Sequence, residues 1–137
     1  MAFKPLTVIL AGLGLVWAAL AAQAHHAFAT EFDVAKPVTL VGKVAKLELI
    51  NPHSWIHIDV VDASGNTVRW MIEGGSPNAL VRRGVTKASV PVGSELSIEG
   101  YQARDGSNRA VGRDIKFTDG RALFFEGSSP AAAAPSP

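Results

Sequence analysis

The chain has 137 residues, contains no cysteine, and carries 13 basic and 12 acidic residues. A chain without cysteine has no disulfides, thiolate metal ligands or thiol nucleophile. Its nearly balanced charge is not the basic footprint of a phosphate-binding surface, so we expect no nucleic-acid partner.

The first 24 residues have the three parts of an export signal. Lys4 is their only charge, an apolar run follows it, and the small residues of Ala22-Gln23-Ala24 form a cleavage site. We predict a signal peptide helix over residues 1–24 that is removed after Ala24. The mature protein is then formally neutral, periplasmic or secreted, and not an integral membrane protein. Cleavage after Ala21 and retention as a membrane anchor are the alternatives.

The segment that follows is rich in β-forming residues. Residues 38–50 are predicted to form a long strand, with a bulge or bend at Gly42 because glycine inside a strand usually marks one. Residues 54–61 alternate between apolar and polar and predict a second strand. After a turn, residues 67–73 pair back as a third strand, with Trp70 on its apolar face.

A short helix is predicted next. Ser76 suits the capping position, Pro77 the first helical position, and Gly84 the left-handed exit after residues 78–83. The sequence therefore places one helix after the third strand.

Three more strands complete the pattern. Residues 95–101 form the fourth and residues 110–118 the fifth, in which parity places Arg113 on the same face as Val111, Ile115 and Phe117. A tight turn leads to a small hairpin strand over residues 121–125.

This order of elements predicts an all-β fold. Three meandering strands, a short helix and two further strands are typical of a small antiparallel barrel of the oligonucleotide/oligosaccharide-binding (OB) type. An open antiparallel sandwich is the alternative. We expect a single domain over residues 25–126 and a disordered Ala/Pro/Ser tail over residues 127–137.

The mature segment resembles a family of small exported bacterial proteins catalogued as a domain of unknown function. The resemblance implies export and a small β fold, and it implies no established activity. It is carried by four motifs, at residues 25–33 (HHAFATEFD), 51–55 (NPHSW), 75–84 (GSPNALVRRG) and 100–110 (GYQARDGSNRA).

All four histidines of the chain are candidate metal ligands. Cleavage after Ala24 would give the first residue both an α-amine and an imidazole, and nitrogen donors of this kind suit copper or zinc. On a straight strand the later two histidines would be roughly 13 Å apart, too far to share one ion unaided. The candidate set is therefore His25, His26, His53 and His57, with Asp59 or Glu31 as a carboxylate partner.

These residues support three functions. The first is an exported binding or accessory protein with a copper or zinc site near the mature N-terminus. The second is a metal-free module that binds a protein or small molecule through the Trp55 and Tyr101 face, the histidines then being a disordered pair, a turn cap and a packing residue. The third is a hydrolytic enzyme, for which no nucleophile or paired-carboxylate motif is recognisable.

Overall fold

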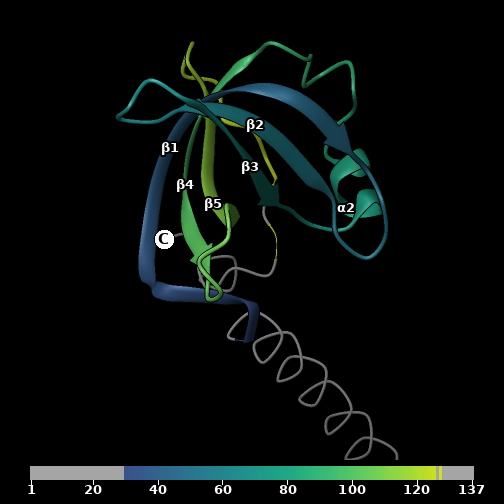
Figure 1. Cartoon of the computed structure of the whole chain (residues 1–137). Helices are drawn as coiled ribbons and strands as arrows, with labels where there is room; N and C mark the ends of the chain where they lie inside the picture. The colour runs from purple at the N-terminus through teal and green to yellow at the C-terminus, as the bar shows by residue number, and fades with distance from the viewer. Residues whose placement is uncertain (1–29, 126, 128–137) are drawn as a thin grey trace, which may run out of the picture.

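The computed structural model describes residues 30–125 and 127. Five strands form a closed barrel in the order β1-β2-β3-β5-β4 (Figure 1). This confirms the prediction of a small OB-like barrel and excludes the open sandwich. The elements are β1 (Phe32–Glu48), β2 (Trp55–Val61), β3 (Thr67–Glu73), α2 (Pro77–Arg82), β4 (Glu95–Ala103) and β5 (Arg109–Phe117).

Four of the five strand pairs are antiparallel, and the fifth closes the barrel in parallel. β3 pairs with β5 through Met71–Arg109, Ile72–Ala110 and Glu73–Val111. The expectation of a purely antiparallel barrel is therefore wrong at this seam. The chain reaches β5 from β3 by way of α2 and β4, which brings the two strands alongside each other in the same direction.

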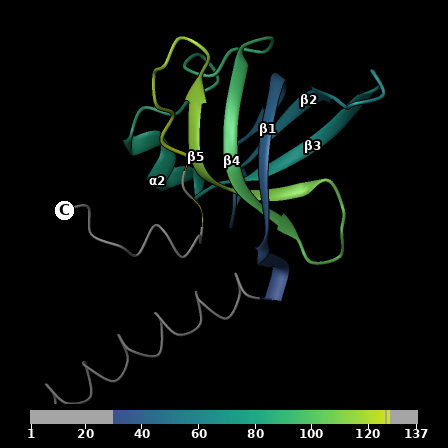
Figure 2. The same cartoon turned by 90° about the vertical axis from the view of Figure 1, so that its left-hand side faces the viewer.

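The first strand is longer than predicted because it begins at Phe32. Its later part pairs with both β2 and β4, and Figure 2 shows it beside β4, which separates it from β5. The register to β4 shifts between Phe32 and Pro37, where the ribbon turns a corner in Figure 1. The first few residues of β1 therefore cross the outside of the barrel.

Two bulges were misplaced or missed by sequence reasoning. In β1 the register shifts between Val44 and Lys46, whereas Gly42 is in register and has no space for a side chain, since a Cβ would lie 2.7 Å from the Asp59 carbonyl oxygen. In β5, Arg113 is the residue that has no register partner in β4. That extra residue reverses parity, so Val111 faces outward whereas Ile115 and Phe117 face the core.

The interior is filled by aliphatic side chains from all five strands, as the alternation predicts. Ile56, Ile58, Ile72 and Leu96 are fully buried, and Trp70 packs against them from a partly buried position. A second cluster lies on the outer face, where Phe32, Ala103 and Val111 are buried and Tyr101 packs against them.

The remaining segments differ slightly from the predictions. The helix lies where expected, but the Ser76 side chain makes no capping hydrogen bond. Residues 121–125 form no strand; Ala122 makes one isolated bridge to Lys116, and Phe125 is buried in the core. Within residues 30–125 and 127, no helix has the length and apolarity needed to cross a bilayer.

Several predictions fall on residues that the structure does not describe. The signal peptide and its cleavage site, His25 and His26, and the tail after Gly127 all lie outside the described residues.

Candidate functional site

An open hollow of about 430 Å³ lies at the end of the barrel where β2 begins and β3 ends. The β1–β2 connection supplies most of its wall. Glu31, which directly precedes β1, also lines it. Its lining residues are Glu31, Ile50, Asn51, Pro52, His53, Trp55 and Glu73.

His53 and Glu73 form an imidazole–carboxylate pair inside this hollow. His53 Nδ1 lies 3.0 Å from Glu73 Oε1, yet the buried Nδ1 atom makes no hydrogen bond of good geometry among the described residues. The imidazole is 40% exposed, whereas the carboxylate side chain is 3% exposed. A nearly dry carboxylate thus faces the buried nitrogen of an imidazole whose remaining atoms are partly open to solvent.

Glu73 is buried, and both ends of the described chain pack beside its pairing partner in β5, Val111. Phe32 packs on Val111, and a Cβ at Gly127 would lie 3.4 Å from the Val111 side chain. Burial raises the pKa of Glu73 above its ordinary value. The positive charges of His53 and Arg109 oppose this increase in pKa, and the Glu31 carboxylate adds to it.

His57 lies in a different environment from His53. Its Nε2 is 2.7 Å from Glu48 Oε2, and Glu48 also binds Lys46. These hydrogen bonds, with Lys46 contributing most, lower the pKa of the Glu48 carboxyl. The structure therefore gives His53 and His57 separate glutamate partners and does not bring these two imidazoles together.

The other expected carboxylate ligands are already paired. Asp59 accepts two hydrogen bonds from Arg69, at 2.6 and 3.0 Å, and this contact lowers its pKa. Glu31 lines the hollow and also contacts Arg109. Among residues 30–125 and 127, no three His, Asp or Glu side chains are grouped so that they could hold a metal ion. A metal site at His53 and Glu73 would need a further donor.

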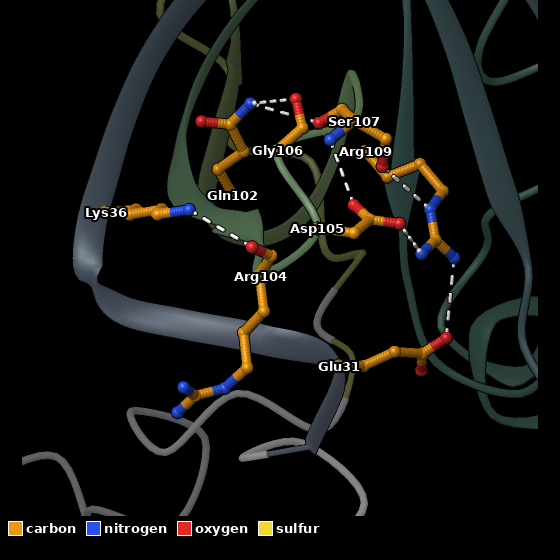
Figure 3. Close-up of polar contacts among 8 residues, drawn as sticks. All are labelled: Glu31, Lys36, Gln102, Arg104, Asp105, Gly106, Ser107 and Arg109. Atoms are coloured by element: carbon orange, nitrogen blue, oxygen red, sulfur yellow. Dashed lines mark hydrogen bonds and ion pairs between the residues drawn. The ribbon is translucent and has the colours of Figure 1, made fainter.

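A polar network links the hollow to the β4–β5 connection (Figure 3). Arg109 Nη1 lies 3.4 Å from Glu31 Oε1, and its other donors reach Asp105 Oδ2 at 3.3 Å and Ser107 Oγ at 3.2 Å. Sequence reasoning included Asp105, Ser107 and Arg109 only within the motif at residues 100–110, and it assigned no role to Arg109 or Glu73. No spacing signal could have found them, since the parallel β3–β5 pairing brings them together.

Trp55 and Tyr101 lie in one row on the outer face of the barrel. Register pairs Trp55 with Glu73, Glu73 with Val111, and Val111 with Tyr101. Residues that pair across strands share a face, and three strand spacings place the two aromatic residues about 14 Å apart. Trp55 borders the hollow, whereas Tyr101 packs under Phe32.

Ser54 is fully buried, and its hydroxyl has no hydrogen-bond partner among the described residues. Alternation along β2 directs it to the barrel interior, away from His53 and the hollow. No observation favours the hydrolytic function.

The fold and the hollow define a small OB-type barrel with a polar site beside its β1–β2 and β4–β5 connections. The sequence pattern of a family of unknown function, DUF6152, matches residues 13–113. The chain belongs to this family, which confirms the resemblance to a family of unknown function. A search of the curated proteins finds no match.

A solved structure with a similar fold is the crystal structure of the mitochondrial single-stranded DNA binding protein Rim1 from S. cerevisiae. It is 15% identical, and the match covers 63% of this chain and 97% of that chain with a TM-score of 0.45. This finding corrects the exclusion of nucleic acid, because a protein matched by its fold binds single-stranded DNA. The exclusion from net charge alone does not stand, and the likeness itself assigns no partner to this chain.

Proposed function

We propose that this protein is a small exported metal-binding protein that holds a divalent transition-metal ion, copper(II) or zinc, at His53 and Glu73. The observation that carries the proposal is the 3.0 Å separation of His53 Nδ1 and Glu73 Oε1 without a hydrogen bond. Two donors bound to one ion at about 2.0–2.1 Å lie roughly 3 Å apart when the angle between them is near 90°.

Burial of the carboxylate supports the same assignment. Burial of an ionised carboxylate costs free energy unless a cation is close, and the raised pKa of Glu73 reflects that cost. A divalent ion would replace the proton and supply the missing charge. The solvent-exposed side of the His53–Glu73 pair leaves room for additional ligands from outside the barrel.

His25 and His26 are the donors that we propose to complete the coordination. His26 precedes Glu31 by five residues, and Glu31 lines the hollow. Five residues span at most about 17 Å, so the chain length allows the imidazole of His26 to reach the hollow that Glu31 lines. If residues 1–24 are removed, the α-amine of His25 becomes one more nitrogen donor.

The position of the hollow also supports a binding function. OB barrels bind oligonucleotides and oligosaccharides with the β2–β3 face and the β1–β2 and β4–β5 connections. Here the β1–β2 connection contributes His53, β2 contributes Trp55 and β3 contributes Glu73.

The test is calorimetric titration of the protein that starts at residue 25 with Cu(II) and Zn(II). We expect His53→Ala and Glu73→Gln to weaken binding by at least about tenfold. His57→Ala is the matched control, because it removes the imidazole of the other histidine–glutamate pair and should leave the affinity unchanged. A form with one extra N-terminal residue should bind copper more weakly if the α-amine is a ligand.

Equal affinity in the His53→Ala and His57→Ala variants would refute the assignment of the site. Absence of binding at micromolar metal would refute the metal function altogether.

One observation favours a second function, a metal-free module. Trp55 offers a half-buried aromatic surface beside two carboxylates, an arrangement that suits an organic cation or a peptide. Capture of such a partner without metal, lost in Trp55→Ala, would support this alternative.

A further inference from the structure

The hollow leaves apolar surface open to solvent. Ile50 is 53% exposed although it lines the hollow. Trp55, which also lines it, is half-buried, and Pro52 is exposed. An aliphatic side chain, an indole and a proline ring around one hollow form a surface that an apolar group, and an aromatic ring above all, can bind.

The described part of the chain begins at this hollow. Thr30 is its first residue, and Glu31, which follows, lines the hollow. Glu31 is held at two points, since its carbonyl oxygen accepts a hydrogen bond of 3.0 Å from the Arg104 amide and its Oε1 contacts the Arg109 guanidinium (Figure 3). The residues that precede Thr30 are therefore tethered beside the hollow.

This tethered segment carries one bulky apolar side chain. Between the predicted cleavage site and Glu31 the sequence is HHAFAT (residues 25–30), in which alanines flank Phe28 on both sides. Three residues span at most about 10 Å, so the chain length allows the Phe28 ring to reach the hollow that Glu31 lines. Few residues lie between the ring and the fixed part of the chain, which keeps the entropic cost of ordering them small.

The other phenylalanines of the predicted mature chain have apolar partners. Phe32, Phe117 and Phe125 are buried, and Phe124 packs against the core. Phe28 is the remaining one, and burial of an aromatic ring contributes more than burial of most side chains. The hollow offers a surface of matching character within its reach.

We propose that the segment before Glu31 lies across the hollow and docks the Phe28 ring against Trp55 and Ile50. The two rings form an aromatic pair, and the ring of Phe28 covers the exposed side chain of Ile50. The segment is thus an intramolecular occupant of the hollow, which an external ligand of Trp55 has to displace. The inference requires no metal, and it goes beyond the proposed function by identifying what covers the apolar part of the hollow.

Nuclear magnetic resonance of residues 25–137 in metal-free buffer tests the docking. This chain has two indole signals, from Trp55 and Trp70, and Trp55→Phe assigns them. We expect nuclear Overhauser contacts from the Phe28 ring to the side chains of Trp55 and Ile50. Phe28→Ala should shift the Trp55 signal, because the neighbouring ring is removed, and leave the signal of Trp70, which packs against the core, in place.

Val34→Ala is the matched control. Val34 is an exposed apolar residue of β1 that does not line the hollow, so its truncation should leave both indole signals in place. A chain that ends at Gly127 tests the other candidate occupant, since a Cβ at Gly127 would lie 3.3 Å from the backbone of Gly74, next to Glu73. A Trp55 signal that shifts on removal of residues 128–137 but not in Phe28→Ala would make the tail the occupant and overturn the inference.

Two further results would refute the docking. One is the absence of contacts from the Phe28 ring to Trp55 and Ile50. The other is a Trp55 signal at the same position in Phe28→Ala and Val34→Ala. Neither result bears on the metal proposal, because apolar contacts in metal-free buffer decide this inference and metal titration decides the other.

Discussion

His53 and Glu73 meet at the end of the barrel, with the imidazole Nδ1 3.0 Å from the carboxylate Oε1. The whole β2–β3 hairpin lies between them in the chain, and His53 itself precedes the first residue of β2. Their proximity follows from the pairing of Trp55 with Glu73, which places the residues just before β2 against the last residue of β3.

The raised pKa of Glu73 predicts how stability depends on pH. An acid whose pKa is higher in the folded state binds its proton more tightly there, so its contribution to stability is complete below its unfolded pKa and is lost as pH rises through the folded value. We expect Glu73→Gln to lose less unfolding free energy than the wild type between pH 5 and pH 8 in metal-free buffer. Urea denaturation across this range measures the difference.

The charges that act on Glu73 are those of His53, Glu31 and Arg109, which stay in place in this variant. Glu95→Gln, which removes an exposed carboxylate from β4, is the control and should follow the wild-type pH profile. Parallel profiles for the wild type and Glu73→Gln would contradict the prediction.

Gly100 is predicted to tolerate no side chain. A Cβ at this position would lie 2.1 Å from the Val111 carbonyl oxygen, a backbone atom that cannot move without disturbing the pairing of β4 with β5. Gly100→Ala should lower the free energy of unfolding by about 3 kcal/mol, measured by chemical denaturation.

The comparison variant is Gly65→Ala, in the turn between β2 and β3. Gly65 has φ of +84° but nothing within 4 Å of its added Cβ, so we expect a loss of about 1 kcal/mol from backbone strain alone. A smaller loss in Gly100→Ala than in Gly65→Ala would show that the close approach at Gly100 relaxes freely.

Export is predicted to remove residues 1–24. The intact mass of protein recovered from the periplasm of an expressing bacterium should correspond to a chain that begins at His25. A chain that begins at Ala22 would place three residues before His25, and it would exclude the α-amine of His25 as a metal ligand. An uncleaved chain would contradict the proposed export.

The fold was largely predictable from sequence because alternation and turn residues act locally. The strict alternation of residues 54–61, with Ile56 and Ile58 on one face, identifies β2 and its buried side without reference to any other strand. Where the predicted facing of a side chain in β5 was wrong, an extra residue in the strand was the cause. The bulge at Arg113 leaves no mark in the sequence and reverses the face of Val111.

The candidate site was predictable only in part. His53 was recognisable as a donor because of its residue type, but Glu73 looked like an ordinary polar residue at the end of a strand. Phe32 and Gly127 pack against Val111, the residue that pairs with Glu73, and the proximity of Glu73 to Arg109 depends on a parallel pairing between distant segments. Such relationships belong to the closed barrel and have no local sequence signature.

The barrel closes through three residue pairs between β3 and β5, and Glu73 forms the last of them. Because this pairing is short, we expect the barrel to open most easily between β3 and β5. Amide hydrogen exchange at Ile72 and Glu73 reports each opening. A ligand held by Glu73 would stabilise β3 at the last of these pairs. A ligand in the hollow would then slow amide hydrogen exchange at the β3–β5 pairs, even where the average structure does not change.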